Sequence, residues 1–131
     1  MTTRAEVGRS VTHRRYVAYG HAHYAGNLVD GAYSLAAFGD VATDLCISTD
    51  GDEGLFASYS DVQFLAPVRA GDILEISATL VRVGSRSREM DFEVRVVGRG
   101  APEHGASAAV VLDPQVVATT ARGVVVVPPS A

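Results

Sequence analysis

The stretch that decides the fold spans residues 28–45 and reads LVDGAYSLAAFGDVATDL. Its apolar positions recur at steps of three and four residues, interrupted by Gly39, as one face of an α-helix requires. Asn27 stands immediately before the stretch and is a residue type that commonly caps a helix N-terminus. The sequence therefore predicts a single helix here, with Asn27 as its N-cap. The apolar positions are Leu28, Ala32, Leu35, Ala42 and Leu45.

The segments around this helix have the period of β-strands. Residues 74–80 and 90–96 alternate apolar and polar side chains, which is typical of strands with one buried face. Residues 55–66 and 116–127 are rich in aromatic and β-branched residues. An earlier strand is expected at about residues 12–19. The chain thus reads as an early strand, one helix and four or five further strands.

This order of elements predicts an α+β protein with a hot-dog fold, a curved antiparallel sheet wrapped around one long central helix. The chain has 131 residues, 47% of them hydrophobic, which is enough for one compact core. We therefore expect residues 1–131 to form a single domain. An exposed edge strand of such a sheet readily pairs with a second copy. We expect a homodimer or a larger homo-oligomer whose subunits share active sites.

Charge and composition exclude several classes of partner. Eleven basic against fifteen acidic side chains give a formal charge of −4, so nucleic acid is not an expected partner. The longest apolar run, residues 123–129, is far shorter than the roughly 20 residues of a membrane span. No secretory signal is recognised, and we expect a cytoplasmic protein with no membrane partner. Cys46 is the only cysteine, so it forms no intrachain disulfide and is expected in the core.

The start of the helix carries residues that suggest chemistry. The N–H groups of a first helical turn have no intrahelical partner, and the helix dipole favours negative charge there. In a thioester, attack at the carbonyl and loss of an α-proton both place negative charge on the carbonyl oxygen, which such amides stabilise. Gly31 and Ala32 leave these amides accessible. Many helices share this feature, so it equally fits a helix start without an oxyanion site.

Three carboxylates lie on one side of the predicted helix. At about 100° per residue, Asp30, Asp40 and Asp44 share one sector, opposite the apolar face. On an ordinary surface helix this would be the solvated face. If the sheet and a partner subunit enclose it, Asp40 or Asp44 becomes a candidate general base. His23 is a further acid–base candidate, although a histidine that closes a loop by hydrogen bonding fits equally well.

Two tyrosines are the last candidates, and several common site motifs are absent. Tyr24 and Tyr59 are expected to line the cleft, or else to be ordinary half-buried tyrosines. The sequence has no HExxH or CxxC motif and no glycine-rich phosphate loop. No metal site is therefore indicated.

Five short runs follow one another in a distinctive order and almost without gaps. They are HYAGNLVDGA (23–32), GDVATDL (39–45), DGDEGLF (50–56), FLAPVRAGD (64–72) and VGSRS (83–87). Together they resemble the β-alanyl-CoA and 3-aminobutyryl-CoA ammonia lyases, hot-dog proteins related to acyl-CoA thioesterases. The resemblance runs from about residue 22 to residue 86 and resumes at the last strand. Residues 98–115 match poorly, and we expect a variable loop there.

The resemblance implies reversible elimination of ammonia from a short β-aminoacyl-CoA, such as β-alanyl-CoA or 3-aminobutyryl-CoA, to the α,β-enoyl-CoA. It implies no organic cofactor, because coenzyme A is part of the substrate. Asp40 or Asp44 would be the base, with the helix-start amides on the enolate oxygen and a second carboxylate on the substrate ammonium. Asp44 departs from the relatives, which carry the longer glutamate there. The implied substrate-binding residues are Tyr24, Gly26, Asn27, Asp30, Gly31, Ala32 and Tyr59.

The CoA moiety is expected to run to the surface, where cationic and hydroxyl side chains can contact it. These are Arg69, Arg82, Ser85, Arg86 and Arg88, which equally fit solvated charges at strand edges. Two other functions stay open. One is an acyl-CoA thioesterase of the same fold, in which a carboxylate activates water. The other is a non-catalytic acyl-thioester binding protein.

Overall fold

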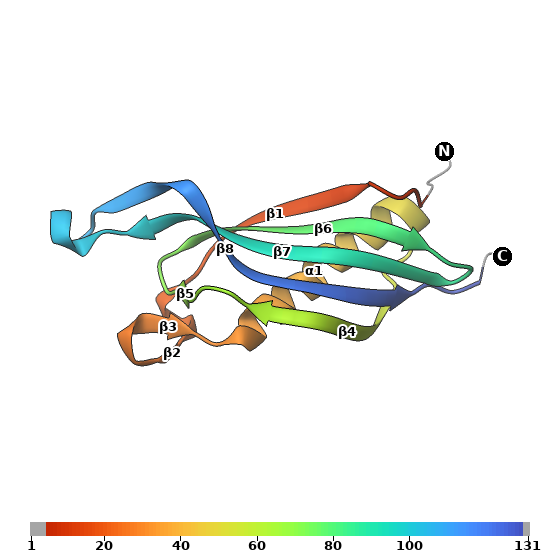
Figure 1. Cartoon of the computed structure of the whole chain (residues 1–131), viewed down its shortest axis with the longest axis horizontal. Helices are drawn as coiled ribbons and strands as arrows, with labels where there is room; N and C mark the ends of the chain where they lie inside the picture. The colour runs from red at the N-terminus through yellow and green to blue at the C-terminus, as the bar shows by residue number, and fades with distance from the viewer. Residues whose placement is uncertain (1–4, 130–131) are drawn as a thin grey trace.

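The computed structural model describes residues 5–129 (Figure 1). Five strands form one antiparallel sheet in the order β1-β6-β7-β8-β4, and three very short strands form a second sheet in the order β2-β3-β5. The single long helix α1 runs behind the large sheet in Figure 1, and most of its contacts are with β1, β4, β6 and β7. This is the predicted arrangement of one central helix against a curved antiparallel sheet. The elements are β1 (Ser10–Tyr16), η1 (Tyr19–His21), β2 (Ala22–Tyr24), η2 (Ala25–Asn27), β3 (Leu28–Val29), α1 (Gly31–Asp50), β4 (Leu55–Phe64), β5 (Val68–Arg69), β6 (Ile73–Val83), β7 (Ser87–Gly100), η3 (Pro102–His104) and β8 (Ala109–Val126).

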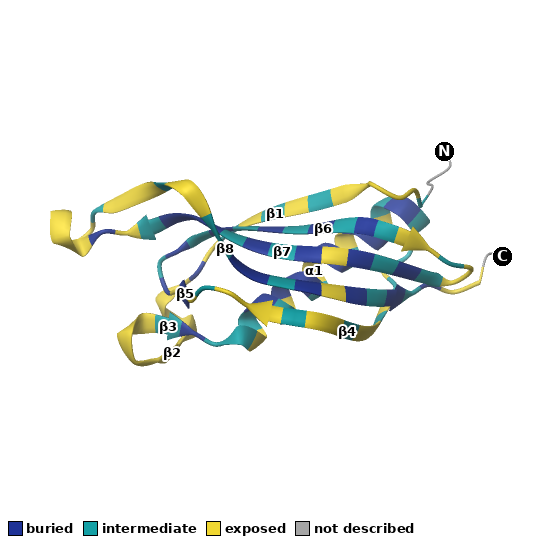
Figure 2. Cartoon of the chain, in the orientation of Figure 1, coloured by how far each residue is buried: buried dark blue, intermediate teal, exposed yellow. Residues whose placement is uncertain are grey.

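The core lies between α1 and the large sheet. Every second residue of β6 and β7 is buried, as the period of two predicts, and Figure 2 shows the alternation as blue and teal bands along these strands. The helix contributes Phe38, Val41 and Leu45, each fully buried. The ring of Phe38 stacks on Phe92 of β7 with 5.0 Å between centroids. Cys46 also lies in this core, as predicted.

The helix begins later than the sequence predicts, and the predicted N-cap is wrong. Asp30 is the N-cap, with the extended backbone of that position, and α1 continues to Asp50. Asn27 has a left-handed φ of 60°, and its carbonyl accepts a hydrogen bond from the Ala70 N–H. Residues 28–29 pair with β5, so strand pairing rather than a helical turn satisfies their backbone. At the other end Gly51, with φ 66°, closes the helix by donating to the Ile47 carbonyl.

Residues 98–115 do not form a loop, so that prediction is also wrong. β7 and β8 stay paired as far as Gly100 and Ala109, and η3 closes the hairpin. The returning strand carries two consecutive β-branched residues, Val110 and Val111, which favour the pairing. This hairpin arm, residues 98–112, projects beyond the rest of the sheet and is mostly exposed (Figures 1 and 2).

Two ion pairs are buried at opposite ends of the molecule. Asp50, the last residue of α1, accepts bonds of 2.7–3.2 Å from the guanidinium of Arg88, whose residue exposure is only 8%. Asp72 is completely buried, and both of its oxygens accept bonds from Arg99, at 2.9 and 2.8 Å. Arg99 also donates to the Pro67 carbonyl at 3.1 Å, so this pair ties the base of the hairpin arm to the loop after β4. Among the described residues, no helix is long and apolar enough to cross a membrane.

Candidate functional site

A groove of about 420 Å³ opens at the start of α1. It is built by β2 and β3 with the first turn of α1, by the end of β4 with the loop that leads into β5, and by β8. Its walls are mostly apolar, and its polar side chains come from Tyr24 of β2, from the helix start and from one position of β8. The lining residues are Tyr24, Val29, Asp30, Gly31, Ser34, Phe64, Leu65, Ala66, Pro67, Val68 and Thr119.

The helix start supplies both amides and a carboxylate to this groove. Gly31 is the first helical residue, so its N–H and that of Ala32 have no acceptor within the helix. A Cβ on Gly31 would lie 2.5 Å from the ring of Phe64, so a larger residue at this position would require that ring to move. The side chain of Asp30 makes no capping hydrogen bond, although Asp30 occupies the N-cap. Its carboxylate is therefore available to a ligand in the groove.

The short segment before the helix places the other predicted residues around the groove rather than inside it. Tyr24 lines the groove and is 58% exposed, while the ring of His23 meets Tyr24 edge-on at 4.7 Å. Gly26 and Asn27 have positive φ angles of 75° and 60° and form the tight turn between β2 and β3. The structure thus brings Tyr24, Asp30 and Gly31 together at the groove. His23 contacts Tyr24 but does not line the groove itself.

Asp40 and Asp44 stand on the outer face of α1, and each has a basic partner on β1. Arg15 donates to Asp40 at 2.7 Å, and His13 lies 2.6 Å from Asp44. Two residues along a strand span about 6.6 Å and four along a helix about 6.0 Å, so the two pairs match in spacing. The sequence analysis missed His13 and Arg15. Their spacing of two residues on one strand matches the spacing of Asp40 and Asp44 on the helix. The sequence alone does not show that this strand lies beside the helix.

The two predicted bases are too far from the helix start to act there within one chain. Asp40 and Asp44 lie nine and thirteen residues after Gly31, which corresponds to about 14 and 20 Å along the helix axis. The carbonyl oxygen and the α-carbon of one thioester are only about 2.4 Å apart. In the single chain these side chains are 62% and 49% exposed. Asp40 also borders a second hollow of about 260 Å³ between α1 and the start of β4.

Tyr59 has a packing role in the single chain. Its hydroxyl donates to the Leu35 carbonyl at 2.7 Å, and its ring lies 4.2 Å from that of Phe56. Burial raises the pKa of Tyr59 to about 12. Tyr59 does not line the groove at the helix start. It fixes the middle of β4 against the first half of α1.

The predicted CoA contacts separate into two groups. Arg69 lies on β5 beside Val68 and the groove. Arg82, Ser85 and Arg86 lie around the β6–β7 turn, at the end of the sheet where α1 finishes (Figure 1). Arg86 donates to the Val127 carbonyl at 3.2 Å. Arg88 is a buried partner of Asp50, so its reading as a surface contact for CoA is wrong.

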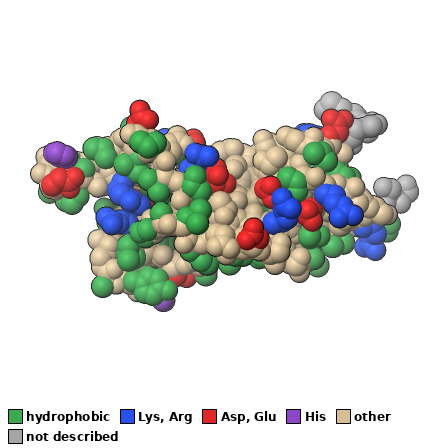
Figure 3. Space-filling view, viewed as in Figure 1, with side chains coloured by type: hydrophobic (Ala, Val, Ile, Leu, Met, Phe, Trp, Pro, Cys, Tyr) green, Lys and Arg blue, Asp and Glu red, His purple; other side chains and the backbone are tan. Residues whose placement is uncertain are grey.

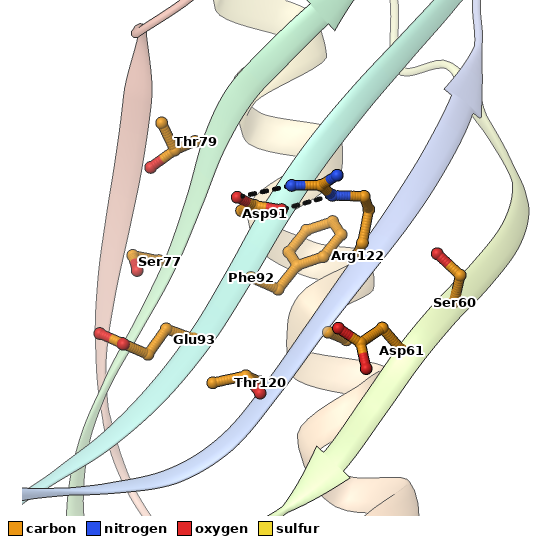
Figure 4. A pocket seen from close by; sticks show the side chains of 10 residues that line it. Ser60, Asp61, Ser77, Thr79, Asp91, Phe92, Glu93, Thr120 and Arg122 are labelled. Carbon is orange, nitrogen blue, oxygen red and sulfur yellow. Dashed lines mark hydrogen bonds and ion pairs between the residues drawn. The ribbon is translucent and has the colours of Figure 1, made fainter.

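A larger hollow, of about 590 Å³, lies on the face of the large sheet away from α1 (Figure 4). Asp91 and Arg122 cross it as an ion pair at 2.7 Å, among serine, threonine and acidic side chains. Figure 3 shows charged side chains of both signs gathered on this face, whereas hydrophobic side chains gather at the end that carries the hairpin arm. None of the predicted site residues lines this hollow. The groove at the helix start is therefore the candidate site.

Comparison with known proteins identifies the family. The model of the thioesterase superfamily matches residues 26–102. A 3-aminobutyryl-CoA ammonia lyase of Acetoanaerobium sticklandii is 50% identical over 107 residues, which cover 82% of this chain and 85% of that protein. The solved β-alanyl-CoA:ammonia lyase of Clostridium propionicum is 34% identical and superposes with a TM-score of 0.86, over 96% of this chain and 94% of that one.

A more distant structure shares the fold alone. It is a hexameric hotdog fold thioesterase of Campylobacter jejuni, 19% identical with a TM-score of 0.73, over 90% of this chain and 87% of that one. The predicted fold and the resemblance read from the five runs are both confirmed. The chain belongs to the thioesterase superfamily and, within it, to the family of the 3-aminobutyryl-CoA and β-alanyl-CoA ammonia lyases.

Proposed function

We propose that this chain is a β-aminoacyl-CoA ammonia lyase, which reversibly eliminates ammonia from a short β-aminoacyl-CoA to give the α,β-enoyl-CoA. The observation that carries the proposal is the 50% identity to a 3-aminobutyryl-CoA ammonia lyase over most of both chains. The groove supports it, because it combines free helix-start amides with a carboxylate and apolar walls. The reaction uses no organic cofactor, since coenzyme A belongs to the substrate. The cytoplasmic location and the single-domain organisation stay predictions.

The proposed reaction begins with transfer of the α-proton to a carboxylate. The electrons of the C–H bond form an enolate, whose oxygen accepts hydrogen bonds from the N–H groups of Gly31 and Ala32. The enolate then collapses to the carbon–carbon double bond as the C–N bond breaks. The substrate ammonium leaves as neutral ammonia and takes that electron pair. The base holds the proton at the end, so charge and atoms balance.

A second copy of the chain supplies the base in this proposal. β4 is an edge strand with Leu55 and Phe64 exposed at its two ends, 76% and 58%, so antiparallel pairing of two copies covers both. The two-fold axis then passes near residues 59 and 60. Because Tyr59 is bonded to the Leu35 carbonyl, the axis lies alongside Leu35. A residue four before Leu35 then faces one about four after it, which brings Gly31 of one copy near Asp40 of the partner subunit.

This geometry makes Asp40 the favoured base, while Asp44 lies one turn farther along. The two groups of predicted CoA contacts can reach one CoA molecule in this dimer only if they come from different subunits. In one chain, Arg69 and the cluster Arg82, Ser85 and Arg86 lie at opposite ends of α1. The proposed assembly is a homodimer or a larger homo-oligomer built from such dimers.

Product analysis tests the function. The protein is incubated with β-alanyl-CoA and with 3-aminobutyryl-CoA, and ammonia, enoyl-CoA and free thiol are measured, with butyryl-CoA as the substrate that lacks an amino group. The expected result is ammonia and acrylyl-CoA or crotonyl-CoA in equal amounts, without free thiol. Release of free thiol instead would identify a thioesterase, and binding of these esters without any product would identify a binding protein. Asp40→Asn and Asp44→Asn are assayed in parallel, and wild-type rates in both would refute the assignment of the base.

A further inference from the structure

Two hydroxyl groups are buried where the groove meets the core. Ser34 of α1 and Thr119 of β8 are each only 2% exposed, and both line the groove. Thr119 donates to the Ser34 oxygen at 3.3 Å, longer than the usual 2.5–3.0 Å of a hydroxyl–hydroxyl bond. Each hydroxyl oxygen has two lone pairs, so this one long bond leaves acceptor capacity at both. Both oxygens can therefore accept a further hydrogen bond from a group bound in the groove.

The position of this pair relative to the helix start suits one part of the proposed substrate. Ser34 is three residues after Gly31, about 4.5 Å along the axis, and helical side chains lean back toward the N-terminus. In a β-aminoacyl thioester the nitrogen is attached two carbons beyond the carbonyl carbon, about 3–4 Å away from it. With the thioester oxygen held by the Gly31 amide, the nitrogen is therefore within reach of Ser34 and Thr119 when the acyl chain runs along the first turn of α1.

The charge of the groove suits an ammonium group. Asp30 is the carboxylate that lines it, and no Lys or Arg side chain is among its lining residues. A primary ammonium has three N–H donors. Three residues of the groove offer acceptors for them: Asp30 with its carboxylate, and Ser34 and Thr119 with their hydroxyl oxygens. An ester without an amino group leaves these acceptors unused, so the trio selects against it.

We propose that Ser34 and Thr119, together with Asp30, form the pocket that holds the β-ammonium group of the substrate and, in the reverse direction, the incoming ammonia. This inference rests on the proposed lyase function and names the residues that give it amine specificity. Asp30 was predicted as a substrate contact, whereas Ser34 and Thr119 carry no motif that the sequence analysis could use.

The reverse reaction tests the pocket, because ammonia and the enoyl-CoA are then separate substrates with separate KM values. Thr119→Val removes the hydroxyl at constant shape, and Ser34→Ala removes the other. Each is expected to raise the KM for ammonium about tenfold or more and to leave the KM for crotonyl-CoA within about twofold, since a hydrogen bond to a charged group is lost. Thr119→Ser is expected to restore most of the ammonium affinity.

The chain offers a matched control one residue away. Thr120→Val makes the same change on the opposite face of β8, where Thr120 lines the hollow of Figure 4. It should leave both KM values unchanged. An unchanged ammonium KM in both Ser34→Ala and Thr119→Val, or an equal rise in both KM values, would overturn the pocket while leaving the lyase function intact. A wild-type protein that neither eliminates nor adds ammonia would overturn the function itself, and the pocket with it.

Discussion

Two inactive variants of this protein are expected to restore activity to each other when they assemble in one dimer. The first variant is Gly31→Pro, which removes one amide from the helix start. Proline is favoured at the first helical position, and Asp30 already has the extended backbone that must precede it. The second variant carries Asp40→Asn and Asp44→Asn together. Each should lose about a hundredfold or more in rate, the first because a lost oxyanion donor costs that much and the second because a lost general base does.

The size of the recovery follows from the separation of the two groups. Because about 14 Å of helix lies between Gly31 and Asp40, each active site needs the helix start of one subunit and the carboxylate of the other. In a mixed dimer one site carries both defects and the other carries neither. Random pairing makes half of the dimers mixed, so about 25% of wild-type activity is expected. If each site lay within one chain, every site would be defective and the mixture would stay inactive.

Co-expression with two different affinity tags, followed by isolation of the doubly tagged protein, removes assemblies that hold one variant alone. For a simple dimer it gives the mixed dimer free of its parents. Ammonia release from 3-aminobutyryl-CoA is then expected at about half the wild-type rate per dimer. Gly31→Ala is the control, because it adds the same Cβ against Phe64 but keeps the N–H. A doubly tagged dimer no more active than the two parents would refute the shared site.

Three further outcomes concern stability. Arg99→Ala should lower the free energy of unfolding by about 3–5 kcal/mol, because it leaves the fully buried carboxylate of Asp72 without its cationic partner. Arg14→Ala, which breaks an exposed ion pair, should lower it by at most about 1 kcal/mol. Urea unfolding measures both, and equal costs would contradict the role of burial. Burial raises the pKa of Cys46 to about 11, so the folded state keeps its thiol proton above the pH at which the unfolded chain loses it. Stability should therefore fall as pH rises from about 9 to 11, by up to about 1.4 kcal/mol per pH unit for this group, and Cys46→Ala should reduce that slope. Tyr59→Phe should cost about 1 kcal/mol with little change in lyase rate; a large loss of rate at unchanged stability would instead place Tyr59 at the substrate.

Local sequence patterns predicted most of the architecture. The alternation in residues 74–80 and 90–96 predicted strands correctly, because side chains on a strand point to opposite faces whatever its neighbours are. The helical period predicted α1, and the glycine at position 31 pointed to an open helix start. The position of the helix N-terminus could not be predicted from local patterns. Asn27 and Asp30 are both good N-caps, and the choice between them depended on strand pairing with β5, which lies about forty residues away.

The sequence by itself thus determined the fold class, the family and the helix-start residues that line the groove, since each of these is encoded by neighbours in the chain. Only the tertiary structure decided which groups meet. It paired Asp40 and Asp44 with Arg15 and His13, buried Arg88 against Asp50, and placed Thr119 against Ser34 from 85 residues away. The physical reason is that a contact between distant segments depends on strand order and register, which no local period records.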